Sequence, residues 1–483
     1  MISLLPTPKK CTLENEQYHP IAPTIYTEVP AWNDAVAAFC ESVGKIYEIE
    51  MTVKESAGVL LKKDNTLAPN AYVLDSTGEE IVIRATTDEG AHYGLATALQ
   101  LISCKDGTLA VQGVLMEDYP EKEYRSFMIA TGRIFHPFKK MLKYVDLCYF
   151  YKVKYLHMHV ADSFLYSIPS KAFPKLMKQG KYYTYQEIEE LNRYAAARGI
   201  TLIPEVECPG HTTLLAEAYP EVFADHADEA RQTVCDPTAF EHGQAGVICA
   251  GSERSFEGIK TLFAEVAELF PNAPYIHIGG DEAPYETWEH CVDCRAYMKK
   301  HGLKNAYELY SEYVGRVASH VLSLGRTPIV WEGFPAEGAH YIPKETIVIA
   351  WESRYQLAPE LLQNGFKIVN ASWKPLYIVT PTCYDHYTYE DILNWNVYNW
   401  QNWHPKCAAT LNPINVQPTA DVLGGTLAAW SMQHEQLISR LLENMPAFSE
   451  RTWTVLRQMD LDTYKRIFGC VSEKAAKLIA DIC

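Results

Sequence analysis

The stretch TYQEIEELNRYAAARGITLIPEVE, residues 184–207, joins two different patterns. Its first part spaces apolar residues three and four positions apart, which is the period of an amphipathic helix. Its last part, TLIPEVE, is a short run of the kind that forms a buried strand. A helix that leads into a strand is the repeating element of parallel α/β folds, so the number of its repeats decides the architecture.

The same alternation continues from about residue 121 to the end of the sheet-forming sequence. Eight strand-like runs can be recognised: SFMIATGR (126–133), YLHMHV (155–160), TLIPEVE (201–207), YIHIGG (275–280), TPIVWEG (327–333), TIVIAWE (346–352), KIVNAS (367–372) and GGTLAAW (424–430). Most precede an amphipathic stretch, which predicts an α/β fold of the (β/α)8 TIM-barrel type. An open doubly wound sheet is the alternative, but it predicts a glycine-rich phosphate turn, and neither GxGxxG nor GxxxxGK occurs.

The first part of the chain has a different rhythm. GEEIVIRAT (78–86) alternates with a period of two, and EGAHYGLATALQLIS (89–103) has a helical period. We therefore predict a small α+β domain over residues 1–118, a catalytic barrel over 119–455, and a helical tail over 456–483 that packs on the barrel.

Composition limits the classes of partner. The 483 residues are 48% hydrophobic and 21% charged, with a net charge of −17, which disfavours a nucleic acid or an anionic membrane as partner. Thirteen scattered cysteines suggest thiols in a reducing compartment, and neither a signal peptide nor an apolar run of membrane-spanning length is visible. We expect a cytoplasmic protein, with a homo-oligomer left open.

Acids and aromatic residues gather where the predicted strands end. The ends carry Arg133, Asp162, Glu205, Glu207, Asp281, Glu282, Trp331, Glu332, Trp351, Glu352 and Trp430. In a barrel the carboxyl ends of all strands meet at one mouth, where active sites lie. Any single one of these residues is more often a helix cap or a core side chain, but together they suit a neutral ligand rich in hydroxyl groups, such as a sugar.

Asp281 and Glu282 are adjacent carboxylic acids behind two glycines in YIHIGGDEAPYETW (275–288). Mutual repulsion and burial should leave one protonated near neutral pH and the other ionised. Hydrolysis by a carboxylate nucleophile needs two carboxyls on opposite sides of the glycosidic bond, roughly 5 Å apart for retention. Chain neighbours are poorly placed for this, so another strand or the substrate itself must supply the nucleophile.

These residues resemble the family 20 glycoside hydrolases, the β-N-acetylhexosaminidases. HIGGDE (277–282) matches their H-x-G-G-D-E signature. YRSFMIATGRIF (124–135), YLHMHVAD (155–162), IPEVECPGH (203–211) and GGTLAAW (424–430) look like their first, second, third and last barrel strands. The likeness covers about residues 120–455, and the N-terminal segment resembles, more weakly, the small domain that often precedes this barrel.

The resemblance implies an exo-acting enzyme without a cofactor or metal that removes terminal β-linked GlcNAc or GalNAc from a glycan or glycoconjugate. Its retaining mechanism is substrate-assisted: the acetamido oxygen attacks the anomeric carbon and an oxazolinium intermediate forms. Glu282 would be the general acid and base, and Asp281 would hold the acetamido N–H. The other implied roles are substrate binding for Arg125, Trp331, Trp351, Tyr377 and Trp430, and support of the general acid for Asp162 and His211.

Two positions depart from the family pattern. An acid usually follows two residues after the tyrosine matched by Tyr377, where this chain has Val379, and another two residues after the last tryptophan, where it has Met432. Both acids serve hydroxyl groups on the far side of the sugar ring, so GlcNAc, GalNAc and C6-modified sugars all stay open. Gln433 or Glu435 could replace the missing acids.

Other interpretations remain. His157 and His159, together with His211 and His277, would suit a barrel metallohydrolase, and a non-catalytic sugar-binding barrel is the non-enzyme alternative. Cys291 and Cys294 have zinc or redox spacing, but without a second nearby pair they are expected to be structural thiols. The long aromatic segment 373–422 is either a wall of the site or an insertion that buries its own side chains.

Overall fold

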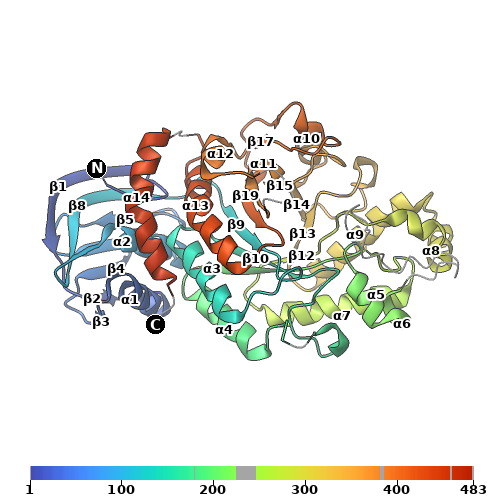
Figure 1. Ribbon diagram of the computed structural model, residues 1–483, viewed down its shortest axis with the longest axis horizontal. Coiled ribbons are helices and arrows are strands. Elements are labelled where there is room, and N and C mark those ends of the chain that lie inside the picture. Colours follow the sequence, from blue (N-terminus) through green and yellow to red (C-terminus); the bar gives the residue numbers. More distant parts are fainter. Residues whose placement is uncertain (1, 179, 225–245, 381–385, 457–458, 481–483) are drawn as a thin grey trace.

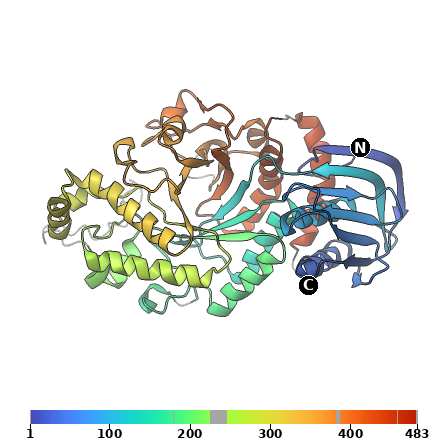
Figure 2. The ribbon, with the colours of Figure 1, turned by 180° about the vertical axis from the view of Figure 1, so that it is seen from behind.

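The computed structural model of the chain describes residues 2–178, 180–224, 246–380, 386–456 and 459–480. Figure 1 shows an N-terminal sheet domain at one end of an elongated molecule and a barrel beside it. Figure 2 gives the same arrangement from behind. Among the described residues, no helix has both the length and the apolar character needed to cross a bilayer.

Eight parallel strands close the barrel. In chain order they are β9 (Tyr124–Ile129), β10 (Tyr155–Ala161), β11 (Thr201–Val206), β12 (Tyr275–His277), β13 (Thr327–Trp331), β14 (Ile347–Ala350), β15 (Lys367–Asn370) and β19 (Val422–Ala429). Each pairs with the next, and β19 closes the ring by pairing with β9 on its other side. The predicted (β/α)8 barrel is therefore confirmed.

Helices cover the outside of the barrel. The longer ones are α3 (Phe138–Phe150), α4 (Tyr185–Ala196), α7 (Glu253–Leu269), α9 (Ala306–Ser323) and α13 (His434–Trp453), and the shorter ones are α5 (Thr213–Ala218), α6 (Pro220–Phe223), α8 (Val292–His301) and α10 (Ala358–Gln363). Helix α4 is the one predicted first. It begins with a capping box in which Thr184 and Glu187 satisfy each other's backbone N–H groups, and it buries Ile188 and Leu191.

The connection between β15 and β19 departs from the simple repeat. It contains α11 (Trp373–Leu376), β16 (Tyr377–Ile378), α12 (Tyr389–Asn394), β17 (Asn399–Trp400) and β18 (Ile414–Asn415). Strand β16 pairs with the carboxyl end of β19, which carries Tyr377 to the mouth. Trp395 stacks on Phe448 and Trp400 donates to the carbonyl of Ala350, so both are buried against the barrel's exterior. Residues 381–385 of this segment lie outside the described residues.

The N-terminal domain is a mixed sheet with two helices. Its strands are β1 (Lys10–Pro20), β2 (Thr24–Thr27), β3 (Thr52–Val53), β4 (Val59–Lys63), β5 (Tyr72–Asp75), β6 (Ile81–Ala85), β7 (Ser103–Lys105) and β8 (Thr108–Asp118), and its helices are α1 (Asn33–Tyr47) and α2 (Asp88–Leu101). The sheet order is β1-β8-β5-β6-β4-β2-β3, with β7 on β8. The last helix, α14 (Leu461–Leu478), packs on α1 as well as on α3 and α13, so it bridges the two domains (Figure 1).

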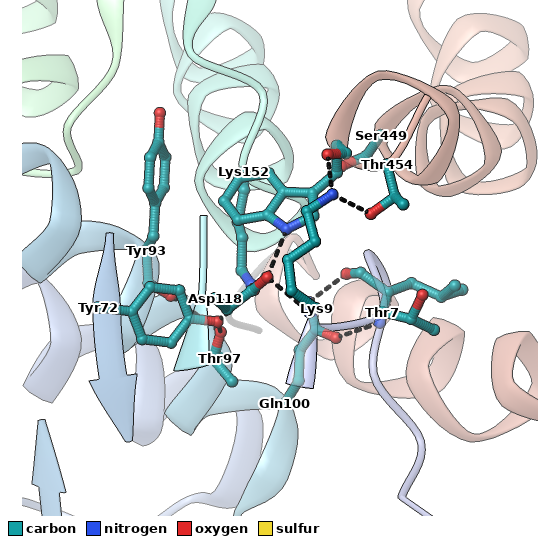
Figure 3. Close-up of polar contacts among 12 residues, drawn as sticks. Thr7, Lys9, Tyr72, Tyr93, Thr97, Gln100, Asp118, Lys152, Ser449 and Thr454 are labelled. Atoms are coloured by element: carbon teal, nitrogen blue, oxygen red, sulfur yellow. Dashed lines mark hydrogen bonds and ion pairs between the residues drawn. The ribbon is translucent and has the colours of Figure 1, made fainter. Parts of the chain in front are cut away.

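A buried polar cluster joins the two domains (Figure 3). Asp118, at the end of β8, accepts hydrogen bonds from the Tyr72 hydroxyl at 2.7 Å and from the Trp453 indole at 2.8 Å. Lys152, in the barrel, lies 3.4 Å from the same carboxylate and donates to Tyr72 at 3.0 Å. All four residues are buried, so this charge pair is part of the domain interface and not of the surface.

Candidate active site

The two adjacent acids face one site because the backbone bends after β12. Gly279 and Gly280 have φ of 70° and 94°, and Glu282 itself has φ of 46°. A Cβ on Gly279 would lie 1.7 Å from a carboxylate oxygen of Glu207, so only glycine fits there. After this bend, oxygens of Asp281 and Glu282 lie within 4.8 Å of each other and of a His211 nitrogen. Left-handed φ at a non-glycine residue is a strain that functional sites often hold.

Glu282 is connected to a chain of charged side chains. His211 Nε2 lies 3.2 Å from Glu282 Oε2, and its Nδ1 lies 3.7 Å from Asp162 Oδ1. Asp162 accepts a hydrogen bond from Arg133 Nε at 2.7 Å and another from His159 at 2.9 Å. Although burial opposes it, the charges of Arg133 and His211 hold the pKa of Asp162 well below its usual range. A permanently ionised Asp162 in turn favours the cationic form of His211.

The two acids are separated in pKa. Burial, with repulsion from the Glu282 and Glu205 carboxylates, raises the pKa of Asp281 to about 7 against the opposing charge of His211. Burial also acts to raise the pKa of Glu282, but the hydrogen bond and charge of His211, helped by Arg133, outweigh it and lower that pKa. Below about pH 7 the proton of the pair is therefore favoured on Asp281, the reverse of what a general acid at Glu282 requires.

Four aromatic side chains form a ring beside the acids. Ring centroids lie 6.4 Å apart for Trp331 and Trp351, 6.2 Å for Trp351 and Tyr377, 6.2 Å for Tyr377 and Trp430, and 6.0 Å for Trp430 and Trp331. The charges of Asp281 and Glu282 add to burial in raising the pKa of Tyr377, which places this hydroxyl near the pair. Trp373 stacks on Tyr377 at 4.7 Å and extends the ring. Such a ring offers apolar walls to a sugar or an acetamido group.

Three fully buried histidines, His157, His159 and His277, surround Glu205 next to the Trp331 side of this ring. Glu205 Oε1 accepts from the Trp331 indole at 2.6 Å and lies 3.0 Å from His277 Nδ1. Its other oxygen lies 2.8 Å from nitrogens of both His157 and His159. Burial works against ionisation, yet the three histidines hold the pKa of Glu205 well below its usual range. Glu205 thereby fixes Trp331, whose face forms part of the site.

Two further acids, Glu207 and Glu352, follow the carboxyl ends of β11 and β14. Burial and the nearby carboxylates of Asp281 and Glu205 raise the pKa of Glu207 well above its usual range. Burial and the charges of Glu282 and Glu332 raise the pKa of Glu352 to about 8. Near neutral pH both are therefore mainly neutral, and a neutral carboxyl can donate a hydrogen bond.

Glu332 has a local structural role. Its carboxylate accepts backbone N–H groups of Ser353 at 2.8 Å, Arg354 at 2.9 Å and Tyr355 at 2.9 Å. These bonds hold the loop after β14 in place, including Ser353 with φ of 56°. The loop carries Glu352 and follows Trp351, so Glu332 positions two residues of the mouth.

Comparison with known sequences agrees with this geometry. Residues 123–455 match the family profile "Glycosyl hydrolase family 20, catalytic domain", and residues 1–119 match "Glycosyl hydrolase family 20, domain 2". The chain belongs to glycosyl hydrolase family 20. Family membership accounts for both the barrel and the domain that precedes it.

Curated relatives carry corresponding names. The "Beta-hexosaminidase" of Vibrio furnissii is 29% identical over 335 residues, which are 65% of this chain and 53% of that protein. The "Beta-hexosaminidase subunit beta" of Entamoeba histolytica is 28% identical over 398 residues, or 80% of this chain and 69% of that protein. This chain therefore spans about half of the length of the Vibrio furnissii relative.

Solved structures share the family 20 fold. The exo β-N-acetylglucosaminidase from Vibrio harveyi, crystallised with N-acetylglucosamine, superposes with a TM-score of 0.81 at 23% identity over 97% of this chain and 76% of that one. The β-N-acetylhexosaminidase from Bacteroides fragilis superposes with a TM-score of 0.79 at 23% identity, covering 96% and 94% of the two chains.

Within the family 20 barrel, the prediction for Arg125 is wrong. Arg125 lies near the start of β9, at the barrel end opposite the mouth, and is 0% exposed. Its guanidinium donates to the carbonyls of Lys152 at 3.0 Å and Lys122 at 2.5 Å and to the Tyr93 hydroxyl, and it lies 5.1 Å from the ring of Trp453. Arg125 belongs to the domain interface and does not reach the site.

Arg133, and not Arg125, lies at the mouth end of β9. It follows the carboxyl end of β9, its side chain is 17% exposed, and its guanidinium lies 4.3 Å from the centre of the Trp430 ring. The sequence placed Arg133 at a strand end, but we predicted the substrate-binding role for Arg125, which lies earlier in the same motif. The structure brings the other predicted residues together at the mouth, namely Asp281, Glu282, Asp162, His211, Trp331, Trp351, Tyr377 and Trp430.

The two departures from the family pattern are apolar positions in the structure as well. Val379 packs against the aromatic cluster of the barrel interior, and Met432 is buried. Gln433 and Glu435 are exposed at the start of α13. Glu352 was recognised at a strand end and Trp373 only as part of the aromatic segment 373–422, and neither was given a role of its own, because a single acid after a strand is usually structural and Trp373 lies in an irregular connection.

Proposed function

We propose that this chain is an exo-acting β-N-acetylhexosaminidase that removes terminal β-linked GlcNAc or GalNAc by a retaining, substrate-assisted mechanism. The observation that carries the proposal is the placement of two adjacent acids on one side of an aromatic ring. Acids from one strand end are poorly placed to flank a glycosidic bond, whereas they suit one contact to the leaving oxygen and one to the acetamido group. The names of the relatives, both β-hexosaminidases, support the same reaction.

In the first step, the acetamido oxygen forms a bond to the anomeric carbon while the bond to the leaving oxygen breaks. Glu282 gives its proton to that oxygen. Asp281 accepts the acetamido N–H and balances the charge of the oxazolinium ion, while Tyr377 donates to the acetamido oxygen and the tryptophan ring encloses the methyl group. In the second step, water attacks the anomeric carbon and returns a proton to Glu282, which regenerates the acetamido group with retained configuration.

Substrate binding must then reverse the protonation of the pair. Asp281 competes with Glu282 for the proton, because its pKa is raised to about 7 and that of Glu282 is lowered. An N–H that donates to Asp281 favours its carboxylate form, and a sugar that displaces water from Glu282 favours the neutral form of Glu282. We therefore infer that the acetamido group moves the proton to the residue that uses it, which couples recognition of the N-acetyl arm to catalysis.

We further propose that Arg133 binds the hydroxyl groups of the terminal sugar. Arg133 combines partial exposure with a fixed orientation, because Asp162 and the Trp430 ring hold it in place. Charge-assisted bonds to the sugar hydroxyls farthest from the scissile bond would leave no room for a longer chain, which predicts exo action.

A panel of 4-nitrophenyl glycosides tests the function. We expect turnover of the N-acetyl-β-glucosaminide, the N-acetyl-β-galactosaminide or both, and no turnover of the β-glucoside, because the glucoside lacks the internal nucleophile. A thiazoline analogue of the cyclised sugar should inhibit more strongly than the free sugar. Comparable turnover of the glucoside, or no binding of the thiazoline, would contradict the proposal. The ratio of the two N-acetyl substrates would also settle the C4 preference left open by Val379 and Met432.

A further inference from the structure

Three buried cysteines meet at a point separate from the catalytic pair. Cys249 Sγ lies 3.6 Å from Cys291 Sγ and 3.7 Å from Cys294 Sγ, and the three sulfur atoms lie within 4.8 Å of one another. All three residues are 0% exposed. The sequence showed only the Cys291 and Cys294 pair, because Cys249 lies 42 residues before Cys291.

These distances suit a tetrahedral metal ion. Zinc binds thiolates at about 2.3 Å, so two sulfurs of a tetrahedral site lie about 3.8 Å apart. The two separations measured from Cys249 are close to this value and far longer than the roughly 2.05 Å of a disulfide bond. Thiolates are soft ligands that select zinc over magnesium or calcium.

The two segments that supply the sulfurs are held together by other contacts. A Cβ on Gly251 would lie 2.4 Å from Cys294 Cα, so the chain after Cys249 touches the start of α8 closely. The Trp288 indole donates to the carbonyl of Ile248 at 3.0 Å, and Arg316 donates to the carbonyl of Ala250 at 2.8 Å. These contacts hold the two backbone segments next to each other, which brings the three cysteines together.

We propose that Cys249, Cys291 and Cys294 bind one structural Zn²⁺ ion. Each thiol would lose its proton to solvent on coordination, and a water molecule or a further side chain would complete the four-coordinate shell. Cys291 is the N-cap and Cys294 the third residue of α8, so the positive end of this helix also favours thiolates there. This inference goes beyond the glycosidase function and does not depend on it.

The site would stabilise the turn that carries the catalytic acids. Cys291 follows Glu282 after one short helical turn, η5 (Tyr285–Glu289), and it caps α8, the helix at the end of the molecule farthest from the N-terminal domain (Figure 1). Tyr285 of this turn stacks on Tyr310 at 5.9 Å, and the Tyr310 hydroxyl donates to the carbonyl of Gly280. Zinc would thus anchor the segment that follows Glu282 without contacting a substrate.

Metal analysis of the purified chain tests this proposal. We expect about one zinc ion per chain after expression in zinc-supplemented medium. Cys249→Ser and Cys294→Ser should lose most of it, whereas Cys148→Ser, which changes another fully buried thiol in α3, should keep it. Zinc-free wild-type protein, or full retention of zinc in both site variants, would overturn the proposal.

A second measurement uses the unmodified protein, in case the serine variants fail to fold. Chelation should lower Tm, zinc but not magnesium should restore it, and Co²⁺ in its place should give sulfur-to-cobalt charge-transfer bands typical of a thiolate site. Absence of those bands, or a Cys291–Cys294 disulfide found by mass spectrometry in freshly purified protein, would overturn the site. If turnover were instead lost on chelation with an unchanged Tm, the metal would act in catalysis and not here.

Discussion

Glu282 and Asp281 differ in exposure as well as in pKa: the Glu282 side chain is 33% exposed and Asp281 is 6% exposed. The more open residue suits proton exchange with a leaving group and then with water. We expect Glu282→Gln to lower kcat/KM by about 10²–10⁴ for an alkyl glycoside and far less for a nitrophenyl glycoside, which needs no protonation. Steady-state kinetics on both substrates measure this, and equal losses would argue against Glu282 as the acid.

Asp281 should make the protein less stable at high pH. Its folded-state pKa is raised to about 7 from 3.8, so the folded protein binds more protons than the unfolded chain between these values, and stability falls as pH rises. Asp281→Asn removes this cost. We expect it to be more stable than the wild type at pH 8, by at most about 4 kcal/mol, with a difference that shrinks towards pH 4. Denaturant unfolding of both proteins at several pH values tests this. The kcat of Asp281→Asn should fall sharply.

The two arginines of the first strand motif provide a matched pair of variants. Arg133→Met should lower kcat/KM by roughly 100-fold, about 3 kcal/mol for one or two lost charge-assisted bonds, and should also lower Tm, because it leaves the buried Asp162 carboxylate without its partner at 2.7 Å. Arg125→Met should lower Tm without a comparable loss of kcat/KM, because it only leaves the carbonyls of Lys122 and Lys152 without their buried donor. Reversed results would restore the substrate role to Arg125.

This pair also shows what the sequence could and could not predict about the site. Residue types at strand ends were predictable, because a barrel brings every carboxyl end to one mouth. The choice between two arginines was not, since both lie in the matched motif. Strand direction decides it: from Arg125 to the end of β9 at Ile129 the chain rises about 13 Å, so only Arg133 lies beyond the mouth end.

At the scale of elements, β12 is shorter than its sequence suggests. The run YIHIGG predicts a strand to Gly279, but the strand ends at His277 because Gly279 and Gly280 take positive φ. Helices with a clear apolar period, such as α4, were predictable from local spacing. The connection from β15 to β19 was not, because its aromatic residues are fixed by contacts with β14 and α13 that lie far away in sequence.

A glycine pair tests the importance of the bend after β12. Gly279 and Gly302 both have φ of 70°, but a Cβ on Gly302 would meet no atom within 4 Å, whereas one on Gly279 would clash with Glu207. Gly302→Ala should therefore lose only the roughly 1–2 kcal/mol of the left-handed conformation and keep its activity. Gly279→Ala should lose more stability and at least about tenfold in kcat/KM, because the acids move. Equal effects of the two substitutions would show that the bend does not position the acids.

At the scale of the whole molecule, the buried charge pair between the domains was not predictable. Asp118 and Trp453 are 335 residues apart in sequence, and no local pattern distinguishes Asp118 from its exposed neighbour Glu117. The domains themselves were visible as a change of rhythm near residue 120. The contacts that hold the two domains together involve Asp118, Lys152 and the bridging helix α14, which are far apart in sequence and meet only in the three-dimensional structure.

Asp118→Asn tests whether this pair makes the two domains unfold together. The substitution leaves Lys152 buried without its counter-charge, which should cost about 3–5 kcal/mol. Burial already lowers the pKa of Lys152 to about 8 against the charge of Asp118. The difference in stability between Asp118→Asn and the wild type should therefore be small above pH 8, where a neutral amine needs no partner.

Glu117→Gln is the control, because Glu117 lies in the same strand as Asp118 but forms only an exposed ion pair with Lys10. It should leave Tm nearly unchanged. Calorimetry should show one transition for the wild type and a lower or divided transition for Asp118→Asn, and an unchanged single transition would mean that other contacts hold the domains together.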